Sequence, residues 1–211
     1  MKPKYRFDID QNTDEWIAEK VGKFSASSGS DLLMDKKTKG YSNLIRKITE
    51  ERITGKPCEN KWSGNSFTER GHELEPIANE SFQMETFEDI KSVGVVEHND
   101  WCLCSPDGLI NDDGLIQIKC PIFSTQWDYL DEIEKAKEKK YEWKPPTNYY
   151  KQMQFELFVT QRDYNYFYSW HPNLKSICVK VLRDEEMIKE IELRLKEAIS
   201  EVKQNINKLK K

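Results

Sequence analysis

GLIQIKCP, at residues 114–121, places two polar side chains in an apolar run that follows an NDDG turn. The run is short and rich in isoleucine, which predicts a strand. Gln117 and Lys119 lie two residues apart, so they share one face of that strand, while apolar side chains alternate with them on the other. The pattern fits a half-exposed strand, and it also fits a strand whose polar face belongs to a site.

Helical and strand patterns alternate on both sides of this run. Helices are expected at residues 15–23, 41–55, 66–87, 125–137 and 147–160 and from about residue 184. Strands are expected at residues 89–98, 101–105, 114–121, 164–170 and 176–182. This order predicts an α/β fold with a mixed central β-sheet flanked by helices on both faces. The helices between the two groups of strands predict parallel pairing there.

Several residues mark where the expected helices begin, end or break. Thr13 is expected to cap the first helix, and Ser42 and Gly55 to start and stop the helix over 41–55. Gly71 and Pro76 are expected to interrupt the segment over 66–87.

The last helix carries apolar residues at a near-regular 3-4 spacing. The positions are Ile188, Ile191, Leu195, Ala198, Val202, Asn205 and Leu209. A coiled-coil seam has this spacing, but the repeat covers only about three heptads and includes an asparagine. Packing against the parent domain is therefore the favoured interpretation.

The bulk properties of the chain limit the class of protein. Its 211 residues contain no repeat or linker, so a single domain over 1–211 is expected, with a helical N-terminal part and a long C-terminal helix. We expect a cytoplasmic protein with no membrane partner, since no apolar run reaches the length of a span and no signal core is present. Five cysteines without a C-x-x-C pair predict buried free thiols rather than a zinc or iron–sulfur site. The net charge of −4 argues against indiscriminate coating of nucleic acid but is compatible with a local basic groove.

Polar residues near the central strand have the chemistry of a phosphodiesterase site. Asp107 lies at a Pro–Asp–Gly turn, upstream of Gln117 and Lys119 on the next strand, and Glu75 lies in the segment RGHELEP. A hard divalent cation needs carboxylate oxygens, and a nearby lysine can orient an attacking water. Metal-assisted phosphodiester hydrolysis is the reaction that fits. Each residue also has an ordinary structural role, as a turn aspartate, a solvated lysine or a surface glutamate.

Four segments together resemble a known family. RGHELEP, CSPDGL, GLIQIKCP and YYKQMQFELFVT, in this order and spacing, resemble the bacteriophage lambda exonuclease group of YqaJ-type viral recombinases, within the PD-(D/E)XK nuclease superfamily. The resemblance implies a restriction-endonuclease-like core and an exonuclease that uses Mg²⁺, or Mn²⁺ in its place, at two ions. It also implies digestion of one strand of duplex DNA from its 5′ end, leaving 3′ overhangs for a single-strand annealing protein. It further implies a ring-shaped homotrimer and a phage or prophage protein in a bacterial cytoplasm.

The resemblance assigns roles to individual residues. Asp107 corresponds to the central metal-binding carboxylate and Gln117 stands at the position of the second acidic ligand. Ile118 would lend its backbone carbonyl, Lys119 corresponds to the catalytic lysine, and Glu75 to the helix glutamate beside the metals. Three side chains of YYKQMQF would support the site and the substrate: Tyr150, Gln152 and Gln154.

The N-terminal segment EWIAEKVGKFSASS resembles the part of the family that anchors a 5′-terminal phosphate. Lys20 stands four residues after Trp16, where relatives carry an arginine, so it keeps the charge but loses the bidentate fork. Ser25 and Ser27 would add hydroxyl donors. Simple helix capping is the alternative for this segment.

A basic run follows the expected helix over 125–137. Its members are Lys135, Lys137, Lys139, Lys140 and Lys144. They fit a solvated helix end and a DNA path equally well, and in the second case binding would depend strongly on salt.

Gln117 departs from the acidic pattern of the family. An amide oxygen offers a cation no formal charge, so we expect weaker metal binding and reduced or abolished cleavage. Two explanations fit: a branch that uses glutamine naturally, or a Glu→Gln exchange that traps a substrate complex. The leading hypothesis is a 5′→3′ exonuclease, and the alternatives are a restriction-like or structure-specific endonuclease and a catalytically inactive DNA-binding protein of the same fold.

Overall fold

The computed structural model describes residues 2–58 and 66–210, except for the side chains of residues 66–69 and 72. Within these residues the helices are α1 (Asp14–Lys20), η1 (Ala26–Ser28), α2 (Gly29–Leu32), α3 (Lys39–Thr54), α4 (Ser66–Thr86), α5 (Phe123–Glu138), α6 (Thr147–Thr160) and α7 (Glu185–Leu209). The strands are β1 (Lys4–Arg6), β2 (Phe24–Ser25), β3 (Ile90–Lys91), β4 (Val95–Asn99), β5 (Cys102–Cys104), β6 (Gly108–Ile110), β7 (Gly114–Lys119), β8 (Tyr164–His171) and β9 (Leu174–Leu182).

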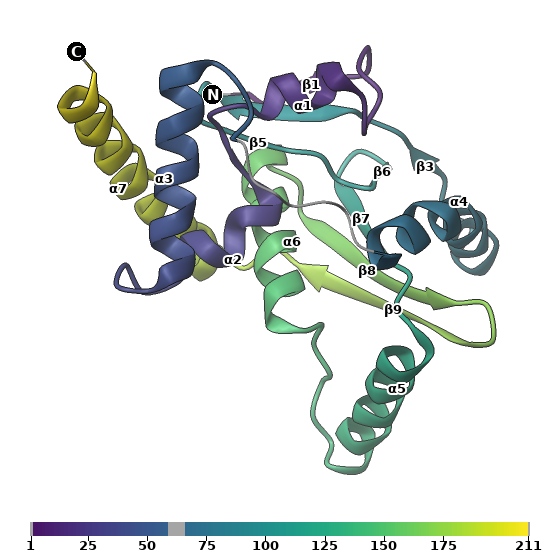
Figure 1. Cartoon of the computed structure of the whole chain (residues 1–211). Coiled ribbons are helices and arrows are strands. Elements are labelled where there is room, and N and C mark those ends of the chain that lie inside the picture. The colour runs from purple at the N-terminus through teal and green to yellow at the C-terminus, as the bar shows by residue number, and fades with distance from the viewer. Residues whose placement is uncertain (1, 59–65, 211) are drawn as a thin grey trace.

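The strands divide between two sheets. One has the order β1-β4-β5-β2 and the other the order β3-β6-β7-β8-β9. Each sheet contains parallel and antiparallel pairs, so the predicted mixed α/β architecture is confirmed (Figure 1). The short strands β1, β2 and β6 were not expected, because two or three residues carry no readable periodicity.

The segment predicted as one strand over 89–98 supplies β3 to one sheet and β4 to the other. Gly94 lies between them, and its N–H donates to the carbonyl of Arg6. A Cβ at Gly94 would lie 2.0 Å from the Ile9 carbonyl oxygen, so only glycine allows the chain to pass this closely. This close approach is where the two sheets separate.

β7 pairs with β8 in parallel, as the intervening helices predict. Gln117 is paired with Phe167 and Lys119 with Ser169, and α5 and α6 connect the two strands. β7 is buried along nearly its whole length, and Gln117 is 1% exposed. The half-exposed strand is therefore excluded for GLIQIKCP.

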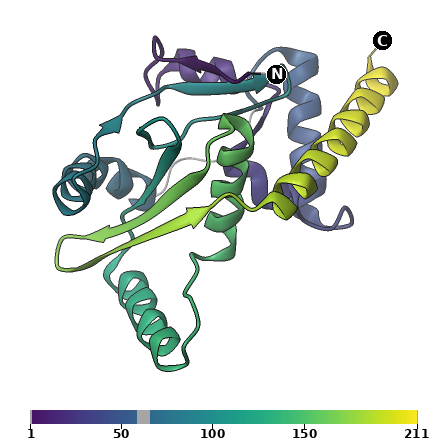
Figure 2. The same cartoon turned by 180° about the vertical axis from the view of Figure 1, so that it is seen from behind.

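The C-terminal helix packs against the domain. Figures 1 and 2 show α7 lying beside α3. Its apolar positions from residue 188 to residue 202 are buried in the core, whereas Leu209 near the end is 62% exposed. The preference for packing over a coiled-coil seam is confirmed for the buried part of the repeat.

Helix boundaries agree with the sequence in part. The Thr13 hydroxyl accepts from the Trp16 N–H as a cap, and Gly55 ends α3 at a φ of 68°. α3 begins earlier than predicted, because Thr38 rather than Ser42 caps it. The prediction of a break at Gly71 and Pro76 was wrong: α4 runs through both, held against β7 and β8 by residues including Ala78 and Phe82.

The five thiols are free, but they do not share one environment. Cys102 and Cys104 are buried in β5, as predicted, whereas Cys58 and Cys120 are partly exposed and Cys178 is exposed. Strand periodicity does not identify which strand is central and which lies at the margin of a sheet. Among the described helices, none is both long and apolar enough to cross a membrane.

Candidate active site

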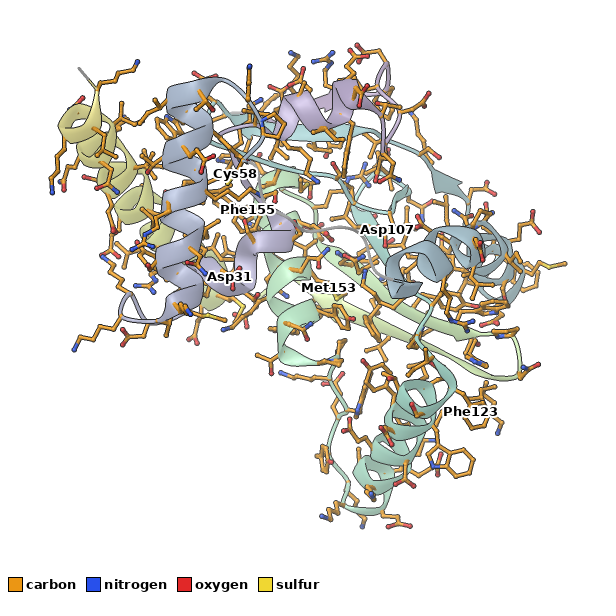
Figure 3. The ribbon with its side chains drawn as sticks, viewed as in Figure 1. Asp31, Cys58, Asp107, Phe123, Met153 and Phe155 are labelled. Atoms are coloured by element: carbon orange, nitrogen blue, oxygen red, sulfur yellow. The ribbon has the colours of Figure 1, made fainter. Side chains whose placement is uncertain are left out.

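A cleft of about 1700 Å³ lies between the N-terminal segment, α4, β7 and α6. Asp107, labelled in Figure 3, lies at the start of β6 on the side of the sheet where α4 is found. The residues of the predicted site that line the cleft are Trp16, Ser27, Glu75, Asp107, Ile118, Lys119 and Gln152. Segments that are far apart in the sequence thus converge on one cavity.

Asp107 is held by two donors from β7. Its Oδ2 accepts from Gln117 Nε2 at 2.5 Å and from the Ile118 N–H at 2.6 Å. Burial raises the pKa of the Asp107 carboxyl, while Lys119 and these two hydrogen bonds oppose that rise. The carboxylate is partly exposed to the cleft, so it can receive a ligand from that side.

Gln117 points its nitrogen at Asp107 and its oxygen at α6. Gln152 Nε2 donates to Gln117 Oε1 at 2.6 Å and to Glu156 Oε1 at 3.1 Å. The two amides and the two carboxyl groups therefore form one hydrogen-bonded row from Asp107 to Glu156. A glutamate at 117 would place one carboxylate oxygen, instead of the amide nitrogen, beside Asp107 Oδ2.

Glu156 was not singled out from the sequence, although a glutamate within FELFV is an unusual residue for a buried helix. Its side chain is 0% exposed, and Asn165 Nδ2 donates to its second oxygen at 2.8 Å. Burial, reinforced by the nearby Asp107 charge, raises the pKa of Glu156 to about 8, although Gln152, Asn165 and Lys119 lower it.

We expect Glu156→Gln to flatten the pH dependence of stability. The folded-state pKa of about 8 lies above the ordinary value of 4.5, so the folded protein keeps a proton that the unfolded chain releases. Stability is therefore lost as pH rises from about 4.5 to 8, and is retained at lower pH. Urea unfolding at pH 5 and pH 9 should show the parent losing roughly 4 kcal/mol more than the variant.

The matched control for this experiment is Glu190→Gln, at an exposed carboxyl of α7. It should keep the pH dependence of the parent. Equal slopes for the parent and Glu156→Gln would show that Glu156 does not titrate above its ordinary range.

Lys119 lines the cleft at the end of β7, and its Nζ lies 5.3 Å from the centre of the Tyr149 ring. Tyr149 also lines the cleft, so the aromatic ring of α6 at this site is Tyr149. Tyr150 points elsewhere: its hydroxyl donates to Asp184 Oδ2 at 3.0 Å. Helical spacing places adjacent residues about 100° apart, and only packing shows which tyrosine faces the cleft.

Gln154 also lies away from the cleft lining. Its Nε2 donates to the Leu182 carbonyl at 2.8 Å, and its oxygen accepts from the Asp184 N–H at 2.9 Å. With Tyr150, it attaches α6 to the start of α7. Of the three predicted supporting residues, Gln152 is the one that donates a hydrogen bond to Gln117.

The oxygen donors in the cleft have the chemistry that a hard divalent cation requires. Asp107 and Glu75 supply carboxylates and the backbone of Ile118 a neutral oxygen, whereas the Gln117 oxygen accepts from Gln152 and its nitrogen faces Asp107. Over the described part of the chain, no group of three His, Cys, Asp or Glu side chains is placed to hold a metal. A glutamate at 117 would add an acidic side chain beside Asp107.

The N-terminal segment contributes a polar corner to the cleft. Trp16 Nε1 donates to Ser105 Oγ at 2.8 Å, and the hydroxyls of Ser25 and Ser27 lie 3.0 Å apart. Trp16, Ser27 and Ser105 all line the cleft. The sequence did not identify Ser105, which lies just before Asp107 in CSPDGL, because a serine beside a turn carries no signal of its own.

Lys20 lies on the other side of Trp16. Its Nζ is 3.5 Å from the centre of the Trp16 ring, and it lines a separate pocket of about 380 Å³ with Lys47. Burial, with the nearby Lys47 charge, lowers the pKa of Lys20 to about 8. The structure brings Trp16 and Ser27 into the cleft and leaves Lys20 behind the indole.

Two lysines of the basic run form ion pairs within α5. Lys135 Nζ is 2.7 Å from Asp131 Oδ2 and Lys137 Nζ is 2.8 Å from Glu134 Oε1, with all four side chains exposed. These pairs favour the solvated helix end over a DNA path for Lys135 and Lys137.

Comparison with known proteins identifies the family of this chain. A family model described as the YqaJ-like viral recombinase domain matches residues 15–163. The chain belongs to the YqaJ-like viral recombinase family. This membership supports a nuclease that acts in phage-type recombination, and it confirms the family that the motifs resembled. A comparison with curated proteins found no match.

Solved structures extend the similarity of this family member over nearly its whole length. An alkaline exonuclease, LHK-Exo from Laribacter hongkongensis, is 32% identical with a TM-score of 0.80, over 94% of this chain and 96% of that one. Its complex with dAMP matches equally. A phage related exonuclease from Haemophilus somnus 129PT is 19% identical with a TM-score of 0.68, over 89% and 96%, which shows the fold alone. The predicted nuclease fold is confirmed.

Proposed function

We propose that the site of this protein is that of a Mg²⁺-dependent 5′→3′ exonuclease, which digests one strand of linear double-stranded DNA and leaves 3′ overhangs, and that Gln117 reduces or abolishes cleavage in this chain. The observation that supports it best is the convergence of Asp107, Glu75 and Lys119 in one cleft, beside a corner lined by Trp16 and Ser27. An exonuclease of similar fold over nearly the whole chain supports DNA as the substrate.

Asp107, Glu75, the Ile118 carbonyl and the side chain at 117 would hold the metal, with Mn²⁺ able to replace Mg²⁺ and two ions in the complete site. When bound, the metal supplies Lewis-acid stabilisation of charge on the scissile phosphate. Lys119 orients the attacking water and screens the charge that develops on phosphate oxygens. Its position at the end of a buried strand fixes its Cα, and its side chain lines the cleft.

The corner at Trp16 would bind a 5′-terminal phosphate. The Ser27 and Ser105 hydroxyls can donate to phosphate oxygens, and Lys20 lies directly behind the indole. Hydrogen bonds to a charged group are worth about 1.5–3 kcal/mol, which is about tenfold or more in binding. Binding of a 5′-terminal phosphate at this corner would therefore favour digestion that begins at a 5′ end.

The test uses Gln117→Glu, the form expected to cut, on duplexes that differ only at their ends. We expect a 5′-phosphorylated linear duplex to be digested from its 5′ ends about tenfold faster than a 5′-hydroxyl duplex, and a covalently closed circle to be spared. Ser27→Ala should reduce this preference, measured as the ratio of kcat/KM for the two ends. Ser30→Ala, in α2 of the same segment, is the matched control and should keep the ratio.

Other outcomes of the same assay identify the alternatives. Cleavage of the circle would indicate an endonuclease on the same fold. Binding of duplex without cleavage by either form would indicate a catalytically inactive DNA-binding protein. The bond between Gln117 and Asp107 favours loss of cleavage only for the form with glutamine at 117.

The assembly follows from the same proposal. We expect a ring-shaped homotrimer that encloses the duplex and delivers the 3′-tailed strand to a single-strand annealing protein. Sizing chromatography with light scattering tests the trimer, and a monomer at all concentrations would contradict it.

A further inference from the structure

Glu156 is a buried carboxyl group that the proposed chemistry does not use. It lies on α6 one turn after Gln152, and it is 0% exposed. Gln152 and Asn165 donate to its two oxygens, at 3.1 Å and 2.8 Å. No cation pairs with it in the hydrogen bonds and ion pairs of the described chain. Burying a carboxyl group without a paired cation costs free energy, so we expect its two acceptor oxygens to have a role in the site.

The Glu156 carboxyl group determines which way the amides of Gln152 and Gln117 donate their hydrogen bonds. The Glu156 oxygen accepts, so Gln152 must present its NH₂ group there, and the other hydrogen of that group goes to Gln117 Oε1. Gln117 is left with its nitrogen toward Asp107. Turning over the Gln152 amide would place its carbonyl oxygen against the Glu156 oxygen, which is unfavourable as long as the proton of the neutral acid lies on the other oxygen, facing Asn165.

We propose that Glu156 is a positioning residue that acts through Gln152 to fix the side chain at 117 beside Asp107. The inference rests on the proposed function of the site as a metal-dependent nuclease. It applies to both residues at 117. With glutamine, the row holds the amide nitrogen against Asp107. With glutamate, the same Gln152 hydrogen bond holds one carboxylate oxygen and leaves the other beside Asp107, where an ion would need it.

Asn165 explains how the row tolerates a change of charge at 156. The Asn165 Oδ1 is buried and has no hydrogen-bond partner. After the Asn165 amide turns, its Oδ1 faces residue 156. A glutamine at 156 can then donate from its amide nitrogen to Asn165 Oδ1, while its carbonyl oxygen still accepts from Gln152. Glu156→Gln therefore keeps the acceptor that Gln152 requires, whereas Glu156→Leu removes it at similar volume.

The decisive measurement is Mn²⁺ binding by calorimetry, made in the Gln117→Glu protein. Glu156→Leu should weaken Mn²⁺ binding about tenfold, because groups that orient a ligand contribute about 10–100-fold to metal affinity. Glu156→Gln should restore the affinity of its parent. On duplex DNA, kcat should fall in the leucine variant by a similar factor, while KM stays the same.

Gln154→Leu is the matched control. Gln154 is buried on the same helix, and its amide also makes two hydrogen bonds, but to Leu182 and Asp184 rather than to the site. It should lower stability and leave Mn²⁺ affinity unchanged. Equal weakening by Gln154→Leu and Glu156→Leu, or parental affinity in a folded Glu156→Leu, would overturn the proposal. Glu156→Met takes the place of the leucine variant where that variant does not fold.

Failure of the proposed function would appear differently. If Gln117→Glu binds no Mn²⁺, the metal-dependent nuclease is refuted, and a crystal structure of Glu156→Leu in the Gln117 chain then tests the row itself. Loss of the contact between Gln117 Nε2 and Asp107 would support a positioning role. An unchanged contact would exclude it.

Discussion

Gln117→Glu is expected to convert this chain from a protein that holds DNA into one that digests it, with a gain in rate of about 100-fold or more in Mg²⁺. The physical reason is the 2.5 Å bond from Gln117 Nε2 to Asp107 Oδ2, which places an N–H donor where a cation would have to lie. A carboxylate removes that donor, adds a charge and leaves an oxygen facing Asp107. The measurement is release of nucleotides from 5′-phosphorylated linear duplex under single-turnover conditions.

The same substitution should make stability depend on metal. Without a cation, the carboxylates at 107 and 117 repel each other in a buried setting, so the melting temperature of Gln117→Glu should fall below that of the parent. Mg²⁺ should raise it again, and it should raise the melting temperature of the parent much less. Gln117→Met, which has neither charge nor amide, is the control and should respond to Mg²⁺ no more than the parent does.

The outcome also decides between the two explanations of the glutamine. Equal digestion by both forms would show that glutamine serves as a competent ligand in this branch of the family. Digestion by the glutamate form alone would show that the exchange is inactivating. If neither form digests DNA, the exonuclease proposal is wrong.

Lys119→Ala, made in the Gln117→Glu protein, is expected to reduce the rate about 100- to 1000-fold. Lys119 lines the cleft, and its positive charge lowers the pKa of both the Asp107 and the Glu156 carboxyls. Its loss removes the group that screens the phosphate and also disfavours the ionised form of Asp107. The rate loss should therefore be partly recovered as pH rises, which a pH profile of kcat checks.

Lys180→Ala is the matched control for this substitution. Lys180 lies on β9, and its ammonium is 3.5 Å from the centre of the Tyr164 ring, so it is also a strand lysine beside a tyrosine. It should keep the parental rate. Full activity of Lys119→Ala, with the protein folded, would remove Lys119 from the mechanism.

Local pattern was sufficient for much of the fold. The alternation in GLIQIKCP determined that Gln117 and Lys119 share a face, because a strand repeats every two residues whatever surrounds it. The caps at Thr13 and Gly55 follow from the same kind of local chemistry. The family motifs predicted that Asp107 lies near Gln117 and Lys119. Asp107 and Lys119 line the cleft, and Gln117 donates a hydrogen bond to Asp107.

Tertiary structure decided which of several equivalent positions reach the site. Tyr149 rather than Tyr150 faces the cleft, and Gln152 rather than Gln154 bonds to Gln117, because α6 has one rotation about its axis that buries its apolar residues. A helical repeat by itself leaves that rotation open.

The sequence by itself predicted the kind of site and determined the strand that carries Gln117 and Lys119, since these depend on residue types and on short repeats. Only the tertiary structure showed that Gln117 donates to Asp107 and that Glu156 lies behind it. A hydrogen bond is directional, and its direction depends on every acceptor in reach. Here those acceptors come from segments up to about 50 residues apart, so the orientation of the amide at 117 is settled only when β7 and α6 pack together.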